Sequence, residues 1–231
     1  MNSDPLEKLL SIGGDALSMV EPVPALMGDD SRTLGGLLRR KNGFYAFESA
    51  LHVFASGDIT ASGRSLEEWN DSRLWKHFYG DLMSEGLFFA EDVFGGQFVL
   101  AGDVVHTFNP ETAELVSFAE SVEAWAAKVL DRYDHATGYS IAHAWQMENG
   151  ALPAGHRLIP RVPFVVGGEY EADNIVPVEA SVAMRYWAGF AKVISELPDG
   201  ANLRFNPQAV ESVICAKWDS KNGSSCLCFN N

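Results

Sequence analysis

Four short apolar stretches lie close together in the middle of the chain, and residues that favour turns separate each from the next. The stretches are residues 87–90, 97–100, 104–108 and 115–118. Gly95-Gly96 follows the first stretch and Asn109-Pro110 follows the third, and these residue types supply the backbone conformations of tight turns. Because short strands with short connections pair with their sequence neighbours, the pattern predicts an antiparallel β-meander.

Helix signals surround the meander. Ser65 with Glu68 has the spacing of a capping box, and Ser121 precedes apolar residues at helical spacing. Thr137 is placed to cap a further helix, which Asn149-Gly150 should end. A final amphipathic helix carries one apolar face, and three tryptophans are expected in the core: Trp125, Trp145 and Trp187. Strands in one run and helices in the next predict an α+β fold with a mixed, mainly antiparallel sheet flanked by helices.

The chain is predicted to hold one large domain with an extension at each end. Its 231 residues suit a single domain, since domains average about 100–200 residues. Residues 1–30 mix acids, Gly and Pro and suggest an N-terminal arm with one short helix near residues 6–11. Residues 31–208 form the predicted domain, in which apolar residues of 34–57 recur at mixed helical spacing. Residues 209–231 are predicted to form a polar tail. It contains all three cysteines, and an odd, clustered set of this kind does not indicate a disulfide framework.

The strong negative charge limits the partners of this chain. Seventeen Lys and Arg stand against thirty-one Asp and Glu, for a net charge of −14. Nucleic acids and anionic membranes need clustered cations, so neither is an expected partner, whereas a basic protein is. No stretch approaches the roughly 18 apolar residues of a membrane span, and the first residues lack the pattern of a signal peptide. The cytoplasm is therefore the expected compartment.

The acidic residues fall in two windows that contain no Lys or Arg, residues 81–127 and 162–184. A solvated face is the ordinary explanation of such a run, but the first window covers the whole predicted meander. One face of the sheet should then be strongly negative and suited to a basic partner, or less favourably to a divalent cation. The predicted partner contacts are Glu91, Asp92, Glu169, Glu171 and Asp173.

The sequence lacks the motifs of the common catalytic and metal sites. There is no Gly-x-Ser-x-Gly, no phosphate-binding glycine loop, no His-Glu-x-x-His and no Cys-x-x-Cys. We expect no catalytic residue, no cofactor and no metal, and we expect His52 and His106 to be core residues with a satisfied nitrogen. A carboxylate pair hidden among the many acids stays open, with Glu91, Asp92 or Glu169 as candidates.

One stretch, residues 88–100 with the sequence FFAEDVFGGQFVL, resembles a signature of the SUKH superfamily, the Smi/Knr-like proteins. The resemblance continues through Phe108-Asn-Pro-Glu-Thr112, the helix of Trp125, Trp145-Gln146 and residues 163–170, and spans residues 34–205 in all. It implies a mixed sheet flanked by helices, in a family without known catalytic chemistry. Many bacterial members act as immunity proteins, which bind and neutralise a polymorphic toxin.

Three functions follow from these patterns. The first is an immunity protein that binds a cognate toxin, such as a basic nuclease effector, and a neighbouring toxin gene would support it. The second is a regulatory protein-binding scaffold, which a gene neighbourhood without toxins would favour. The third is a carboxylate-dependent hydrolase, in which alanine at the acting carboxylate would abolish turnover without lowering the melting temperature. The sequence predicts no oligomeric state.

Overall fold

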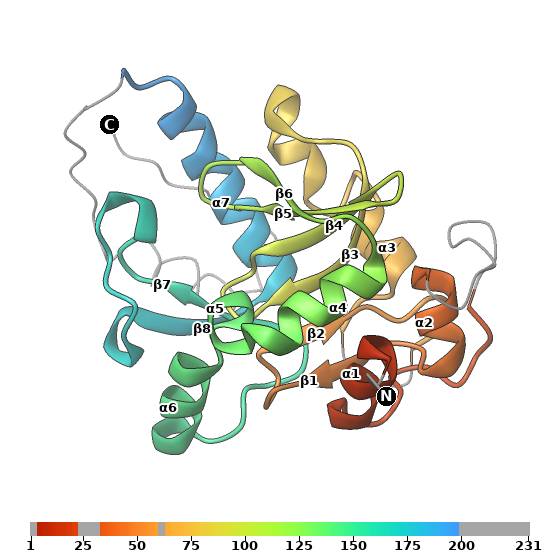
Figure 1. Cartoon of the computed structure of the whole chain (residues 1–231). Helices are drawn as coiled ribbons and strands as arrows, with labels where there is room; N and C mark the ends of the chain where they lie inside the picture. The colour runs from red at the N-terminus through yellow and green to blue at the C-terminus, as the bar shows by residue number, and fades with distance from the viewer. Residues whose placement is uncertain (1–3, 23–32, 60–62, 199–231) are drawn as a thin grey trace, which may run out of the picture.

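A computed structural model describes residues 4–22, 33–59 and 63–198 of the chain (Figure 1). Its main sheet has six strands in sequential order, each antiparallel to the next. The strands are β1 (Phe44–Ala46), β2 (Leu51–Val53), β3 (Leu87–Asp92), β4 (Gln97–Ala101), β5 (Val104–Phe108) and β6 (Leu115–Ala119). The predicted meander and the α+β class are therefore confirmed.

The meander begins earlier in the chain than predicted. The spacing in residues 34–57 suggested helical packing, but only α2 (Leu34–Arg40) is helical there. β1 and β2 form a hairpin that buries Phe44, Ala46, Leu51 and Val53. Each of these two strands is only three residues long, so the sequence alternation is too short to be told from helical spacing.

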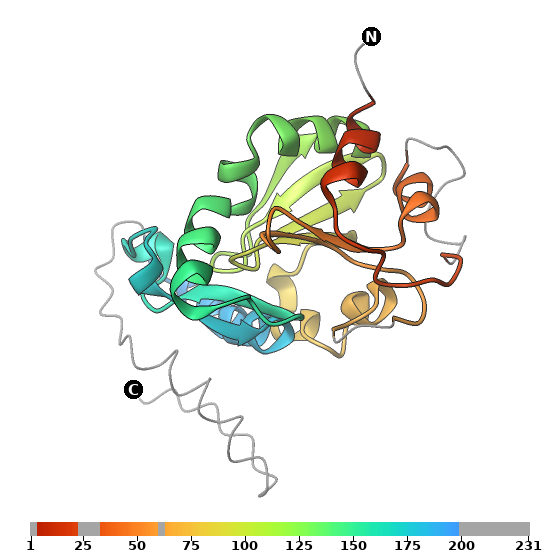
Figure 2. The same ribbon diagram turned by 90° about the horizontal axis from the view of Figure 1, so that it is seen from below.

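Helices cover both faces of the main sheet and give three layers (Figure 2). On one face lie α1 (Pro5–Ile12) and α4 (Val122–Asp131), and Trp125 of α4 packs edge-on against Phe89 and Phe98. The other face contacts α3 (Leu66–Asn70), the short 3₁₀ helices η2 (Lys76–Phe78) and η3 (Gly80–Leu82), and α7 (Ala180–Ser195). There Trp75 packs against Phe88.

A second, two-stranded sheet lies beside the first. It consists of β7 (His156–Pro160) and β8 (Ile175–Glu179), paired antiparallel, with η4 (Phe164–Val166) and η5 (Ala172–Asn174) between them. One apolar cluster joins this sheet to α7 and another joins it to α6 (Tyr139–Asn149). The backbone N–H of Leu158 donates to the carbonyl of Val93 at 2.7 Å, which ties the small sheet to the β3–β4 turn.

Most of the predicted helix ends are confirmed. Ser65 and Glu68 form the capping box of α3, Ser121 caps α4, and α6 ends at Asn149 before Gly150. Thr137 is the exception: it is the last residue of α5 (Tyr133–Thr137), and its hydroxyl donates to the carbonyl of Tyr133. The predicted core tryptophans Trp125, Trp145 and Trp187 are all buried.

The described part of the N-terminal segment, residues 4–22, is not a separate arm. The predicted short helix exists as α1, but Leu6, Leu9 and Leu10 are buried in the main core, where α1 packs beside α4. Three leucines at helical spacing cover apolar surface that the sheet and α4 leave open. The predicted tail, with Cys215, Cys226 and Cys228, lies outside the described residues.

Candidate functional site

A groove of about 500 Å³ opens on the side of the meander formed by β4, β5 and β6. Phe98, Thr107 and Val116 lie side by side in the strand register and line it. The turn of residues 109–111, His135 of α5 and residues 164, 165 and 170 complete much of the lining. Val116 is 49% exposed, so the helices of this layer leave the outer part of the sheet uncovered at the groove.

Three aromatic side chains meet at the groove: Phe94 of the β3–β4 turn, Phe164 of η4 and Tyr170. The rings of Phe164 and Tyr170 stack, with centroids 3.9 Å apart and planes inclined by 7°. Phe94 meets both rings edge-on, at 5.1 Å and 6.0 Å. Tyr170 is 61% exposed, so this aromatic trio presents part of its surface to solvent, and aromatic ring faces attract cations.

Asp92 ends β3 and places a carboxylate in the lining of the groove. Its Oδ1 accepts hydrogen bonds from the backbone N–H groups of Phe94 and Gly96, both at 2.8 Å, and no described residue donates to Oδ2. Burial raises the pKa of Asp92 to about 7, although the two backbone hydrogen bonds lower it. Asp92 is thus only partly ionised at neutral pH, and a nearby cation would favour its charged form.

Glu111 holds the segment that carries two rings of the aromatic trio, Phe164 and Tyr170. Its side chain is buried, and its two carboxylate oxygens accept from the backbone N–H groups of Phe164 at 3.1 Å and Val165 at 2.9 Å. Burial raises the pKa of Glu111, and the two backbone hydrogen bonds oppose that rise. The contact joins the turn after β5 to η4, which are 53 residues apart at Phe164, and so fixes two sides of the groove.

Replacing Glu111 by glutamine is expected to lower the free energy of unfolding by about 1–3 kcal/mol, because the amide NH₂ would face a backbone N–H without an acceptor. Urea denaturation measures the loss, and faster hydrogen exchange at Phe164 and Val165 locates it. The matched control is Glu114→Gln, since Glu114 is exposed and also lines the groove. Equal stabilities of the two variants would contradict the role of Glu111.

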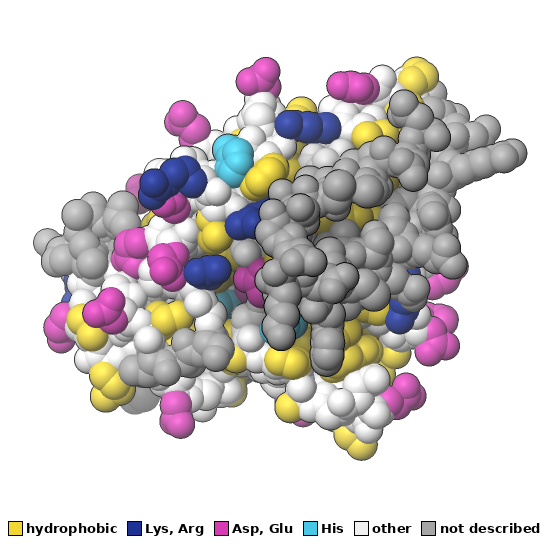
Figure 3. Space-filling model, turned by 180° about the vertical axis from the view of Figure 1, so that it is seen from behind, with side chains coloured by type: hydrophobic (Ala, Val, Ile, Leu, Met, Phe, Trp, Pro, Cys, Tyr) yellow, Lys and Arg dark blue, Asp and Glu magenta, His cyan; other side chains and the backbone are white. Residues whose placement is uncertain are grey.

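The charge of the lining is one-sided. Three carboxylates, Asp92, Glu111 and Glu114, contribute to it, and no Lys or Arg is among the described residues that line the groove. The face behind the view of Figure 1 differs, since Lys and Arg side chains there sit among acidic and apolar ones (Figure 3). The described lining residues therefore give the groove itself a negative charge.

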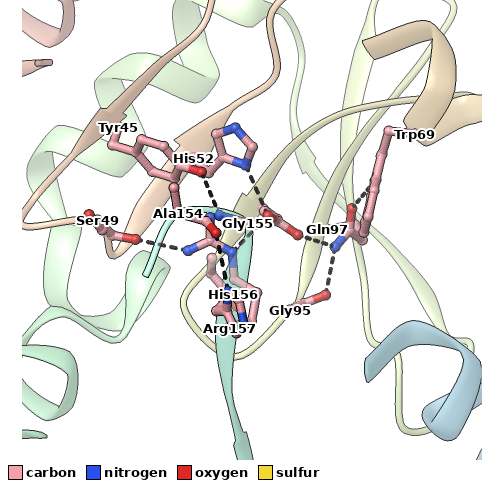
Figure 4. Close-up of polar contacts among 12 residues, drawn as sticks. Tyr45, Ser49, His52, Trp69, Gly95, Gln97, Ala154, Gly155, His156 and Arg157 are labelled. Atoms are coloured by element: carbon pink, nitrogen blue, oxygen red, sulfur yellow. Dashed lines mark hydrogen bonds and ion pairs between the residues drawn. The ribbon is translucent and has the colours of Figure 1, made fainter. Parts of the chain in front are cut away.

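Next to Asp92 in the sequence, Glu91 belongs to a buried polar network with His52 and Arg157, both of which are labelled in Figure 4. Its Oε1 accepts from Arg157 Nε of β7 at 2.7 Å and from His52 Nδ1 of β2 at 2.9 Å. Burial opposes the charge of Glu91, but Arg157 and His52 outweigh it and lower its pKa to about 2, while burial lowers the pKa of His52. Arg157 also donates from Nη1 to the carbonyl of Ser49 at 2.9 Å.

The predicted contact role of Glu91 is therefore wrong. Its side chain is 1% exposed and its charge is paired inside the protein, so no partner reaches it. Neighbouring residues of a strand point to opposite faces, and this alternation sends Glu91 into the network and Asp92 into the groove. His52 is the satisfied core histidine that the sequence predicted, whereas His106 is only half-buried and its Nδ1 has no hydrogen-bond partner among the described residues.

The remaining predicted contacts are exposed, and in the sequence they lie within three residues of Tyr170, which lines the groove. Glu169 and Glu171 flank Tyr170, and Asp173 lies in η5. The structure thus brings Asp92 and the segment of Glu169 to one groove, although they are distant in sequence. Sequence reasoning missed Glu111, Phe164 and Tyr170, because only the fold shows which turn meets which loop.

Metal binding and membrane crossing are two further properties that residues 4–22, 33–59 and 63–198 could support. Within these ranges no three His, Cys, Asp or Glu side chains form a group that could hold a metal ion. None of the helices there combines the length and the apolar character that crossing a membrane requires.

Comparison with known proteins adds information on the fold. No family model and no curated protein matches the chain. Among solved structures it is similar to the crystal structure of Atu4351 from Agrobacterium tumefaciens, with a TM-score of 0.51 and 15% sequence identity, over 81% of this chain and 88% of that one. At this identity the likeness establishes the α+β architecture.

Proposed function

We propose that this chain is an immunity protein, which binds and neutralises a cognate bacterial polymorphic toxin through the acidic groove and the exposed acids beside it. It acts by binding and not by catalysis. The observation that carries the proposal is the lining of the groove, in which the described residues combine three carboxylates with a partly exposed aromatic trio and include no Lys or Arg. The resemblance to SUKH proteins supports the same function.

The toxin that fits this surface is a basic protein. A net charge of −14 attracts a positively charged partner over a distance and speeds encounter. A toxin that cleaves nucleic acid must itself hold phosphates with cationic side chains, and an acidic inhibitor can occupy the same surface. Glu169, Glu171 and Asp173 would form the rim that meets such a partner first.

A search of the neighbouring genes for a toxin domain, followed by co-expression of that domain with this chain, tests the proposal directly. We expect the two proteins to purify as a complex and growth to be restored in cells that otherwise die from the toxin. A neighbouring toxin that neither binds nor is neutralised would refute the proposal. Capture of a non-toxin partner by the same groove would instead favour the regulatory scaffold.

Reversing the three rim charges should slow association. We expect the triple variant Glu169→Lys, Glu171→Lys, Asp173→Lys to bind the toxin with an on-rate lower by at least roughly tenfold at low salt, and the gap to narrow at high salt. The matched control reverses three exposed acids outside the groove, Glu85, Asp103 and Glu120, with the same change in net charge. Equal rates for the two variants would show that the position of the charges is irrelevant.

One observation favours a second candidate, the carboxylate-dependent hydrolase. Asp92 lies in a groove, and its pKa of about 7 suits a group that exchanges protons at neutral pH. Asp92→Asn would then abolish turnover of a substrate while the melting temperature stays unchanged. Glu91 is no longer a candidate for that chemistry, because its carboxylate is paired with Arg157.

A further inference from the structure

We infer that the groove takes an arginine side chain of the partner, with the guanidinium flat on the aromatic trio and its charge beside Asp92. This rests on the proposed function in one respect, that the partner is a basic protein. It adds which side chain of the partner is recognised and which atoms recognise it.

The aromatic trio offers a flat surface at the right place. Phe164 and Tyr170 are parallel, and Phe94 supports both from the edge, so the exposed Tyr170 ring is held in one orientation. Glu111 anchors η4 by accepting hydrogen bonds from the backbone N–H groups of Phe164 and Val165. A ring fixed in this way loses little conformational entropy when a planar cation stacks on it.

Asp92 provides the countercharge. Both of its backbone donors bind Oδ1, and Oδ2 accepts nothing from the described residues, so one carboxylate oxygen is left for an incoming N–H donor. Gly96 packs against this oxygen: a Cβ at that position would lie 2.4 Å from Oδ2. A carboxylate beside apolar rings gains more from a cation than an exposed carboxylate does.

Guanidinium fits this combination better than ammonium does. It is planar, stacks on aromatic faces, and is more weakly hydrated, so it loses less on entering a groove walled by rings. The ammonium of lysine is compact and strongly hydrated, and it has no flat face to lay on Tyr170. We therefore expect arginine to be preferred over lysine.

Binding of the arginine side chain should be coupled to loss of a proton from Asp92. The pKa of Asp92 is about 7 in the free protein, and a cation beside it favours the ionised form, so binding strengthens as pH rises through 7. The other ionisable groups near Asp92 are Glu91 and Arg157 of the network and, around the groove, Glu111, Glu114, His135 and Tyr170. His135 is the one imidazole among these groups, so His135→Gln serves as a control for Asp92.

The test uses three tripeptides with blocked ends, Gly-X-Gly with X as arginine, lysine or citrulline, titrated into the full chain and followed by backbone amide NMR shifts. We expect the arginine peptide to shift Phe94, Gly96 and Tyr170 saturably, and the neutral citrulline peptide to bind at least roughly tenfold more weakly. Tyr170→Ala and Asp92→Asn should each weaken arginine binding by roughly fivefold or more. Asp103→Asn, which removes an exposed charge at the β4–β5 turn, should leave it unchanged.

The pH series adds a readout that a structural defect would not give. Between about pH 6 and pH 8 we expect arginine binding to strengthen by roughly five- to tenfold in the wild type and in His135→Gln, and to stay flat in the double variant Asp92→Asn, His135→Gln. Equal binding of lysine and arginine, or shifts confined to other surfaces, would overturn the inference. If the toxin binds but its complex is insensitive to Tyr170→Ala and Asp92→Asn, the inference fails and the proposed function stands. If the arginine peptide binds the groove and no basic protein does, the proposed function fails alone.

Discussion

Replacing Glu91 by glutamine is expected to lower the free energy of unfolding by about 3–5 kcal/mol, one of the two largest effects of a single substitution that we predict. The variant leaves Arg157 charged, 0% exposed, and without its carboxylate partner at Nε. Arg157 Nη2 already lacks a hydrogen bond within the described part of the chain, so the guanidinium has no spare partner to turn to. Urea denaturation at neutral pH measures the loss.

The control is an equivalent substitution on the surface. Glu120 is exposed, and Glu120→Gln should change the free energy of unfolding by no more than about 0.5 kcal/mol. The double variant Glu91→Gln, Arg157→Met removes the unpaired charge as well, and it should recover much of the loss. A double variant as unstable as Glu91→Gln alone would mean that the ion pair is not the cause.

The pH dependence of this ion pair has a definite sign. The pKa of Glu91 is about 2 in the folded protein, below its usual value of 4.5. Its contribution to stability is therefore fully present above about pH 4.5 and is lost as pH falls towards 2. Glu91→Gln lacks this contribution, so its stability should fall less steeply than that of the wild type over the same interval.

Local signals in the sequence were sufficient for much of the fold. The turns at Gly95-Gly96 and Asn109-Pro110 predicted four of the six strands of the main sheet, and the hydroxyls of Ser65 and Ser121 predicted two helix starts. Such interactions span only a few residues, so the residue types alone reveal them. The charge windows likewise indicated the acidic groove, although not its shape.

The site itself depends on contacts between distant parts of the chain. Glu91 meets Arg157 across 66 residues, and Glu111 meets Phe164 across 53. Both carboxylates look alike in the sequence, since each follows an apolar stretch in the same acidic window. Only the pairing of β3 with its neighbours and the position of η4 decide that one is an internal counterion and the other an anchor of the groove wall.

The β1–β2 turn is a second feature that could not be predicted from the sequence. Phe47, Glu48 and Ser49 have φ of 51°, 52° and 69°, a left-handed conformation that costs roughly 1–2 kcal/mol for each residue other than glycine. No glycine marks the turn. Contacts from elsewhere hold it: Arg157 donates to the carbonyl of Ser49, and Gln146 donates to that of Glu48, each at 2.9 Å. The network of Glu91 therefore also supports a turn that local preference disfavours.

The first helix provides the other large effect. Leu9→Ala is expected to lower the free energy of unfolding by about 2–5 kcal/mol, because the side chain is 0% exposed and its removal leaves a cavity between α1 and the main core. A separate N-terminal arm with one short helix, as the composition of residues 1–30 suggested, would lose almost nothing from this substitution. Ile12→Ala is the matched control on the same helix, since Ile12 is 42% exposed, and we expect it to change stability by less than about 1 kcal/mol. If urea denaturation shows equally small losses for Leu9→Ala and Ile12→Ala, α1 is not part of the core and the predicted arm is correct. A large effect of Leu9→Ala alone would mean that the core of the domain begins with α1, well before residue 31.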